Sequence, residues 1–153
     1  MAGRPGGTFD LPSPPPPFLQ QAASGATPDG TQLVGTYYPG SSSRGYLIYR
    51  AEFIPFNVPG AVASGANDIS PSGKNIVGVF KHEPAVATEG HGFVAERNGL
   101  EVEDWVFTEV VYPDTVVVAT RVIGINAGGD LVGAYNHADG VWHGFLASRT
   151  RNR

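Results

Sequence analysis

The sequence predicts an all-β repeat protein of three β-meander units. Short runs rich in valine, isoleucine, leucine and aromatic residues recur from Thr31 onward, which is typical of strands. The 21 glycines and 13 prolines are spread between these runs and indicate tight turns. A Leu/Ile-Val-Gly motif, followed two residues later by an aromatic residue, occurs three times. An ordered recurrence of this kind indicates an internal repeat.

The strand-like runs follow one another closely along the chain. We expect strands at 31–38, 45–50, 75–80, 91–97, 105–111, 115–125, 130–135 and 142–148. A further element that ends in a proline turn occurs at 53–61 and again at 107–114. Turn sequences such as Pro-Asp-Gly and Pro-Ser-Gly separate the runs. No apolar period of 3.6 extends over a useful length, and only residues 18–23 favour a helical turn.

The repeat divides the chain into units. Residues 1–24 form a proline- and glycine-rich N-terminal segment, and residues 149–153 form a basic tail. Between them we place unit 1 at 25–63, unit 2 at 64–118 and unit 3 at 119–148. Each unit pairs its Val-Gly motif with a later Gly-aromatic motif, at 44–46, 91–93 and 143–145. One unit cannot bury both faces of its sheet, so we expect neighbouring units to stack.

The glycine of each Val-Gly motif falls inside a predicted strand, at Gly35, Gly78 and Gly133. Glycine in a strand interior usually marks a bulge or a close backbone approach. We therefore expect another strand to approach each of these glycines.

The third unit lacks the element that ends in a proline turn. Thr-Phe-Asp-Leu-Pro at 8–12 has a similar order of aromatic, aliphatic and proline residues. We therefore expect residues 7–12 to supply the missing strand of unit 3, which would close the chain tail to head. Deleting residues 1–13 should then lower stability sharply.

These repeats resemble the HAF-type extracellular repeat family. The nearest copy is GINAGGDLVGAY (124–135) followed by HGFL (143–146), and related copies cover roughly residues 7–148. The resemblance implies a propeller-like β repeat of the kind found in exported or surface proteins of bacteria, with no catalytic residues. Closed propellers usually have four to eight blades. Three units are therefore compatible with a fragment, a compact three-unit structure, or half of a six-unit ring made by dimerisation.

Composition excludes several classes of function. The net charge is −4, and the one basic cluster is Arg149, Arg151 and Arg153, which argues against nucleic-acid binding. With no cysteine, disulfides and thiolate sites are excluded. No run approaches the roughly 20 apolar residues of a membrane span. Residues 1–30 show no secretory signal pattern, although the family resemblance suggests an extracellular location. We expect no cofactor.

The histidines are the most suggestive polar set. Units 2 and 3 carry the same pair, which comprises His82 with His91 and His137 with His143. Three readings are open. Two histidines from each of these neighbouring units can approach a shared zinc or copper ion. Alternatively, each imidazole can hydrogen-bond a neighbouring turn, or the histidines can contact a ligand. We favour the structural reading and assign no metal.

The remaining candidates are aromatic and acidic. Tyr38 and Trp142 flank loops and fall out of phase with the core aromatics, so they can offer rings to a carbohydrate or protein ligand. Trp105 stands beside the acidic residues Glu101, Glu103 and Asp104. The ligand-binding candidates are therefore Tyr38, His82, His91, Trp105, His137, Trp142 and His143, with no catalytic residue assigned.

Three readings of function follow from these candidates. The favoured one is a non-enzymatic binding or assembly scaffold. The alternative is a carbohydrate-active hydrolase or lyase that uses loop histidine and acidic residues. A third is a purely self-associating protein, because exposed strand edges at 105–112 and 116–123 would promote pairing between chains.

Overall fold

The computed structural model describes residues 21–82 and 90–150, and it is an all-β fold of three antiparallel sheets. Sheet 1 contains β1 (Gln21–Ala26), β2 (Gln32–Tyr37), β3 (Arg44–Tyr49) and β4 (Glu52–Phe56), paired in chain order. The prediction of an all-β chain of successive meanders is confirmed. Residues 7–12 and their expected pairing with unit 3 lie outside the described residues.

Sheets 2 and 3 repeat the meander. Sheet 2 contains β5 (Ala63–Ile69), β6 (Asn75–Lys81), β7 (His91–Glu96) and β8 (Val106–Val110). Sheet 3 contains only β9 (Val117–Ile125), β10 (Leu131–His137) and β11 (Trp142–Ala147). A 3-10 turn, η1 (Val102–Asp104), precedes β8. Within 21–82 and 90–150 no helix is long and apolar enough to cross a membrane.

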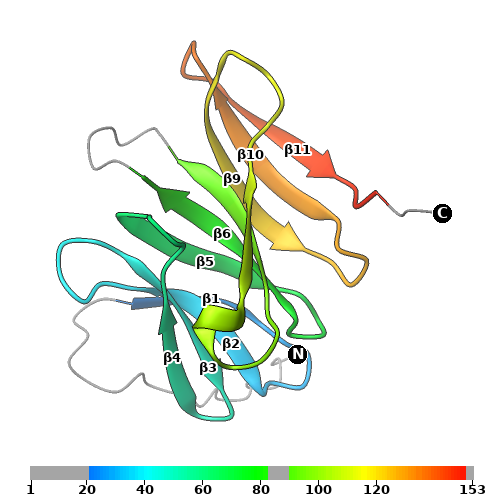
Figure 1. Ribbon diagram of the computed structural model, residues 1–153. Coiled ribbons are helices and arrows are strands. Elements are labelled where there is room, and N and C mark those ends of the chain that lie inside the picture. Colours follow the sequence, from blue (N-terminus) through cyan, green and yellow to red (C-terminus); the bar gives the residue numbers. More distant parts are fainter. Residues whose placement is uncertain (1–20, 83–89, 151–153) are drawn as a thin grey trace, which may run out of the picture.

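The three sheets are layered face against face, with sheet 2 in the middle (Figure 1). Sheets 1 and 2 enclose one core that includes Val34, Leu47, Phe56, Phe93 and Trp105. Sheets 2 and 3 enclose a second core around Val77, Val122 and Leu131. The far face of sheet 1 carries a third cluster around Tyr37 and Tyr46. Sheet 2 therefore packs through both of its faces, as the stacking of repeats requires.

The motif glycines lie where strands approach most closely, as predicted. A methyl group at Gly35, Gly78 or Gly133 would overlap a backbone carbonyl oxygen of the preceding strand. It would also meet the aromatic ring of the later Gly-aromatic motif in the same unit. That ring is Tyr46 for Gly35, Phe93 for Gly78 and Phe145 for Gly133. The strand before each motif also shifts register, as β1 does between Ala23 and Gly25. All three units thus share one local construction.

The first strands of sheets 1 and 2 depart from the sequence-based expectation. β1 begins at Gln21, so the helical turn expected at 18–23 is wrong for residues 21–23. β5 also forms a strand that the pattern of large apolar residues did not predict. Both are built from small residues, QAASGA and ASGANDI. Small side chains allow β5 to pack directly against β1 and β2 of the neighbouring sheet.

Polar side chains tie the sheets together. Arg44 Nη1 donates to the carbonyl oxygen of Val62 at 2.9 Å, which links sheet 1 to the start of sheet 2. Asn67 Nδ2 donates to the carbonyl oxygen of Val122 at 2.7 Å, and Asp68 Oδ2 accepts from Ile125 N at 3.0 Å. These bonds fix the position of β9 against β5.

A second polar link joins sheets 1 and 2 at the opposite end. Arg97 donates to Gln32 Oε1 and, at 2.7 Å, to the carbonyl oxygen of Gly73. Burial lowers the pKa of Arg97 below its ordinary value. Its guanidinium also lies near the rings of Tyr49 and Trp105.

Candidate functional site

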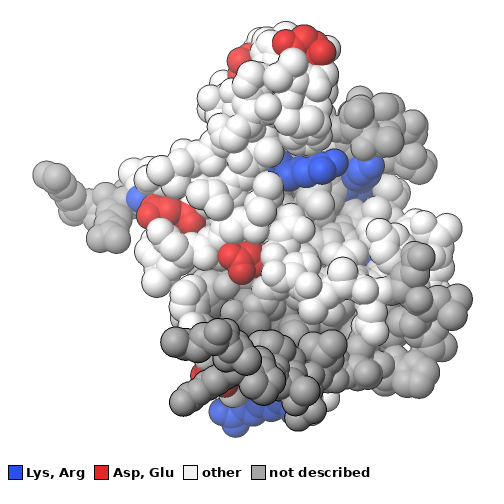
Figure 2. All heavy atoms as spheres, turned by 180° about the vertical axis from the view of Figure 1, so that it is seen from behind, with Lys and Arg blue, Asp and Glu red and all other residues white. Residues whose placement is uncertain are grey.

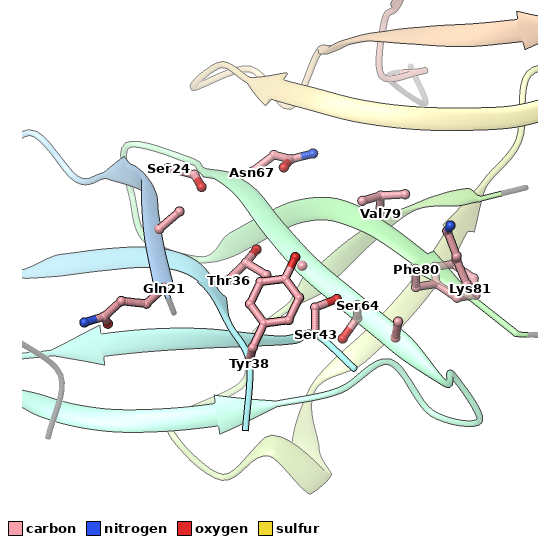
Figure 3. Close-up of a pocket in the computed structure, with 13 residues that line it drawn as sticks. Gln21, Ser24, Thr36, Tyr38, Ser43, Ser64, Asn67, Val79, Phe80 and Lys81 are labelled. Atoms are coloured by element: carbon pink, nitrogen blue, oxygen red, sulfur yellow. The ribbon is translucent and has the colours of Figure 1, made fainter. Parts of the chain in front are cut away.

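A groove of about 820 Å³ lies between sheets 1 and 2, along the side where β1 and β5 approach each other. Most of its lining residues are small or uncharged (Figure 3). They are Gln21, Ala22, Ser24, Thr36, Tyr38, Ser43, Ala63, Ser64, Gly65, Asn67, Val79, Phe80 and Lys81. No carboxylate is among them. The groove therefore offers hydroxyl, amide and backbone groups in place of an acid–base pair.

The floor of the groove is held by hydrogen bonds within the protein. Ser64 is buried, and its Oγ donates to Asn57 Oδ1 at 2.6 Å. Its backbone N donates to the carbonyl oxygen of Ser43 at 3.1 Å. Thr36 Oγ1 lies so close to Gly65 that any side chain at position 65 would collide with it. The floor is therefore fixed by contacts between the two sheets.

Tyr38 lines the same groove. It follows the end of β2 and is 43% exposed. Figure 3 shows the ring among other lining residues of the groove, which include Thr36, Ser43 and Ser64. An exposed ring above fixed hydroxyl groups can stack on a flat apolar face of a ligand while its polar edges are hydrogen-bonded. Tyr38 is the one sequence-based candidate in the lining of this groove.

The sequence-based reading missed most of this site. Ser24, Ser64 and Asn67 carry no recognisable motif, and they lie on β1 and β5. The available signal was a small-residue run interrupted by glycine, which indicates a strand approached closely by another backbone.

The first histidine pair meets within unit 2. The ring centroids of His82 and His91 are 5.8 Å apart, and both rings contact Phe80. His91 Nδ1 contacts the carboxylate of Glu109 on β8. His82 and Glu109 also line a small hollow of about 190 Å³ beside Phe107.

The second pair meets within unit 3. The ring centroids of His137 and His143 are 6.2 Å apart, and His143 stacks on Tyr135. His137 Nε2 is 3.9 Å from Asp114 and its Nδ1 is 3.8 Å from Asp139. A hydrogen bond with Tyr112 raises the pKa of Tyr135 above its ordinary value. In the described part of the chain, no three histidine or acidic side chains are arranged to hold a metal ion.

The two tryptophans have different surroundings. Trp105 is only 5% exposed, and its Nε1 donates to the carbonyl oxygen of Gly99 at 3.1 Å. Trp142 is 40% exposed, and the Arg121 guanidinium lies 4.5 Å from its ring centroid. Trp142 belongs to sheet 3 and Tyr38 to sheet 1, so the structure does not place these two candidates in one site.

The acidic residues near Trp105 line a separate hollow. Glu101 and Glu103 share it with Glu52, which begins β4. All three are exposed. On the face opposite to that in Figure 1, charged side chains are scattered among uncharged ones (Figure 2).

Comparison with known proteins adds a distant structural similarity. No family model matches the chain, and no curated protein matches it in sequence. The crystal structure of TolB from Acinetobacter baumannii is similar, with 10% identity and a TM-score of 0.48. The alignment covers 86% of this chain and 33% of TolB, so the chain spans about a third of that protein's length.

Proposed function

We propose that this chain is a non-enzymatic binding module that holds a neutral carbohydrate in the groove between sheets 1 and 2. The observation that carries the proposal is the Tyr38 ring in a groove lined by hydroxyl and amide groups, with no carboxylate among the described lining residues. Sugars present alternating hydroxyl edges and apolar faces. The hydroxyl and amide groups of the groove can hydrogen-bond the edges of a sugar, and the Tyr38 ring can stack on its apolar face.

The neutral lining favours a neutral ligand. Among the residues that the structure describes, Lys81 is the one charged residue that lines the groove, so an anionic or cationic chain would find little charge complementarity there. A carbohydrate also suits the floor, because Ser64 and Asn57 are already positioned by each other. Little ordering of the protein is then needed on binding, which favours affinity.

Titration with neutral oligosaccharides tests this function. Cello-, malto- and chito-oligosaccharides are added to the full chain, and binding is followed by calorimetry. We expect Tyr38→Ala to weaken binding about fivefold, because loss of a stacking ring removes about 1 kcal/mol. Thr36→Val, which removes one hydroxyl from the lining, should also weaken binding.

Trp142→Ala is the matched control. Trp142 is exposed to nearly the same extent as Tyr38 but lies on sheet 3. This variant should bind as the wild type does. Equal losses in the two aromatic variants, or no binding of any oligosaccharide, would contradict the proposal.

A second candidate function is carbohydrate hydrolysis at the acidic hollow. The observation in its favour is the shared position of Glu52, Glu101 and Glu103, because glycosidases use a pair of carboxyl groups. Release of reducing ends from the same oligosaccharides, abolished in Glu101→Gln, would support this function over simple binding.

A further inference from the structure

A second pocket, of about 330 Å³, lies between sheets 2 and 3. Its apolar lining comes from both sheets and consists of Val94, Val110, Ile125, Leu131 and Ala147. Polar residues, Arg149 among them, line it as well. Its volume is that of a small-molecule site, for which about 300–1,000 Å³ is usual.

Arg149 is the repeat equivalent of Arg97. Each arginine comes four residues after the aromatic residue of the Gly-aromatic motif in its unit. Each also lies against the turn glycine of its own unit. Arg97 donates to the carbonyl oxygen of Gly73 at 2.7 Å, and a Cβ added at Gly129 would meet Arg149 Cδ at 3.2 Å. The two guanidinium groups therefore belong to corresponding places, one in each space between sheets.

Between sheets 1 and 2 this place contains an aromatic ring. The Arg97 guanidinium lies 5.6 Å from the ring centroid of Trp105. The Trp105 ring packs against Phe56 and Phe107, with centroid distances of 5.3 and 6.3 Å. The protein itself thus shows an indole that is enclosed between two sheets with an arginine beside its ring.

The space between sheets 2 and 3 lacks equivalent rings among the described residues. Val110 on β8 takes the place of Phe56 on β4, because each pairs with the glycine of a Gly-aromatic motif. Trp105 and Phe107 lie just before and on β8, the fourth strand of sheet 2. The described part of sheet 3 consists of three strands only. The pocket thus corresponds to the space that aromatic rings fill between sheets 1 and 2.

Arg149 supplies the available charge at the edge of the pocket. Glu96 also lines the pocket, but its Oε1 lies 3.7 Å from Lys74 Nζ, so its charge is paired. Asp130 accepts a hydrogen bond from the backbone N of Arg149 at 3.2 Å. Within residues 21–82 and 90–150 no ion pair holds the Arg149 guanidinium. It can therefore lie over a bound ring, because a cation is attracted to the face of an aromatic system.

We propose that this pocket binds a free, uncharged, planar aromatic molecule of indole size, enclosed by the apolar side chains of sheets 2 and 3 with the Arg149 guanidinium over its face. The apolar walls remove the ring from water, which favours binding. Recognition of the π face by Arg149 distinguishes an aromatic ring from a saturated one. The proposal is independent of the carbohydrate groove, which lies between sheets 1 and 2.

Titration with indole tests the proposal on the full chain, with calorimetry and the methyl resonances of Val94, Val110 and Leu131 as readouts. We expect these resonances to shift as indole is added. Cyclohexanol, a saturated ring, should bind more weakly. Arg149→Gln should weaken indole binding about two- to fivefold, the effect of an exposed cation–π contact, and should leave cyclohexanol binding unchanged.

Variants that fill the pocket locate the bound ring. Val110→Phe gives β8 the ring that Phe56 gives β4, and it should abolish indole binding. Ala147→Phe fills the same space from sheet 3, so the test does not depend on the folding of one variant. Leu146→Phe is the control, because Leu146 is 69% exposed on the outer face of β11, and it should bind indole as the wild type does.

Several outcomes would overturn the proposal. Wild-type affinity for indole in both filled variants would place the ring elsewhere. Absence of indole binding, equal affinity for indole and cyclohexanol, or an unchanged affinity in Arg149→Gln would contradict the recognition of an aromatic ring. Tyr38→Ala should keep full indole binding, so a failure of the carbohydrate proposal can be told apart from a failure of this one.

Discussion

Phe93 lies with its ring against Gly78 on the neighbouring strand, in the space that any other residue at position 78 would fill. On its other side Gly78 faces the carbonyl oxygen of Gly65 on β5. The same arrangement joins Tyr46 to Gly35 and Phe145 to Gly133. The Val-Gly and Gly-aromatic motifs are therefore two halves of one contact, repeated in each sheet.

Replacement of Gly78 by alanine should destabilise the protein. The added methyl group has no space between the ring and the carbonyl oxygen, and overpacking of a core typically costs about 1–3 kcal/mol. Gly40→Ala is the control, because nothing lies within 4 Å of a Cβ at that position and its φ is not positive. Chemical denaturation should show a clear loss for Gly78→Ala and little change for Gly40→Ala. Similar values for both variants would contradict the contact.

A pH effect is expected at the turn between β1 and β2. Asp29 accepts hydrogen bonds from the Thr27 hydroxyl and from the backbone N and hydroxyl of Thr31, which lower its pKa below 3.8. Because the folded pKa is the lower one, the ionised carboxylate contributes stability above its ordinary pKa. This contribution is lost as the pH falls through the folded pKa.

Nuclear magnetic resonance titration of the Asp29 carboxyl group measures this shift. In Thr27→Val the hydroxyl is absent, so the midpoint should move up toward the ordinary value for aspartate. Thr31 still donates in this variant, so the return should be partial. An identical midpoint in both proteins would show that the Thr27 hydroxyl does not lower the pKa.

Two leucines at one repeat position should respond differently to a charge. Leu47 pairs with Val34 and is 0% exposed between sheets 1 and 2, whereas Leu146 pairs with Val132 and is 69% exposed on the outer face of sheet 3. Leu47→Glu buries an unpaired carboxylate and should prevent folding. Leu146→Glu should leave the melting temperature nearly unchanged.

The Leu146→Glu variant also tests self-association. Ile123, Val132 and Leu146 on sheet 3 are all exposed, and they form an apolar surface of the kind that marks an interaction site. If the chain forms oligomers through this surface, Leu146→Glu should shift its solution mass toward that of the monomer. A wild-type chain that is monomeric at all concentrations would contradict self-association.

The strands with large apolar residues could be predicted from sequence, but β1 and β5, the first strands of sheets 1 and 2, could not. Valine and aromatic residues around the motif glycine indicate β2, β6 and β10 in the sequence. β1 and β5 consist mainly of alanine, serine and glycine, which have low strand propensity outside a tertiary context. Their small size is what the close approach of the sheets requires.

The candidate site escaped prediction for the same physical reason. Its floor lies on β1, β5 and the loop before β3, where serine and asparagine look like turn residues in isolation. The repeat identified His82 with His91 and His137 with His143 as equivalent pairs, and in the structure the two rings of each pair lie near each other. The pairing of histidines across units depended on inter-sheet geometry, which motif spacing does not specify.

The core between sheets 1 and 2 and the core between sheets 2 and 3 contain different kinds of side chains. This difference determines which part of the molecule unfolds first. Sheets 1 and 2 share a cluster of rings that includes Phe56, Phe93 and Trp105. Sheet 3 is held mainly by smaller aliphatic groups and a few hydrogen bonds from β5. Local opening follows the least buried elements. Backbone amides of sheet 3 should therefore exchange with solvent through a partial unfolding that leaves the first two sheets, and the groove between them, intact.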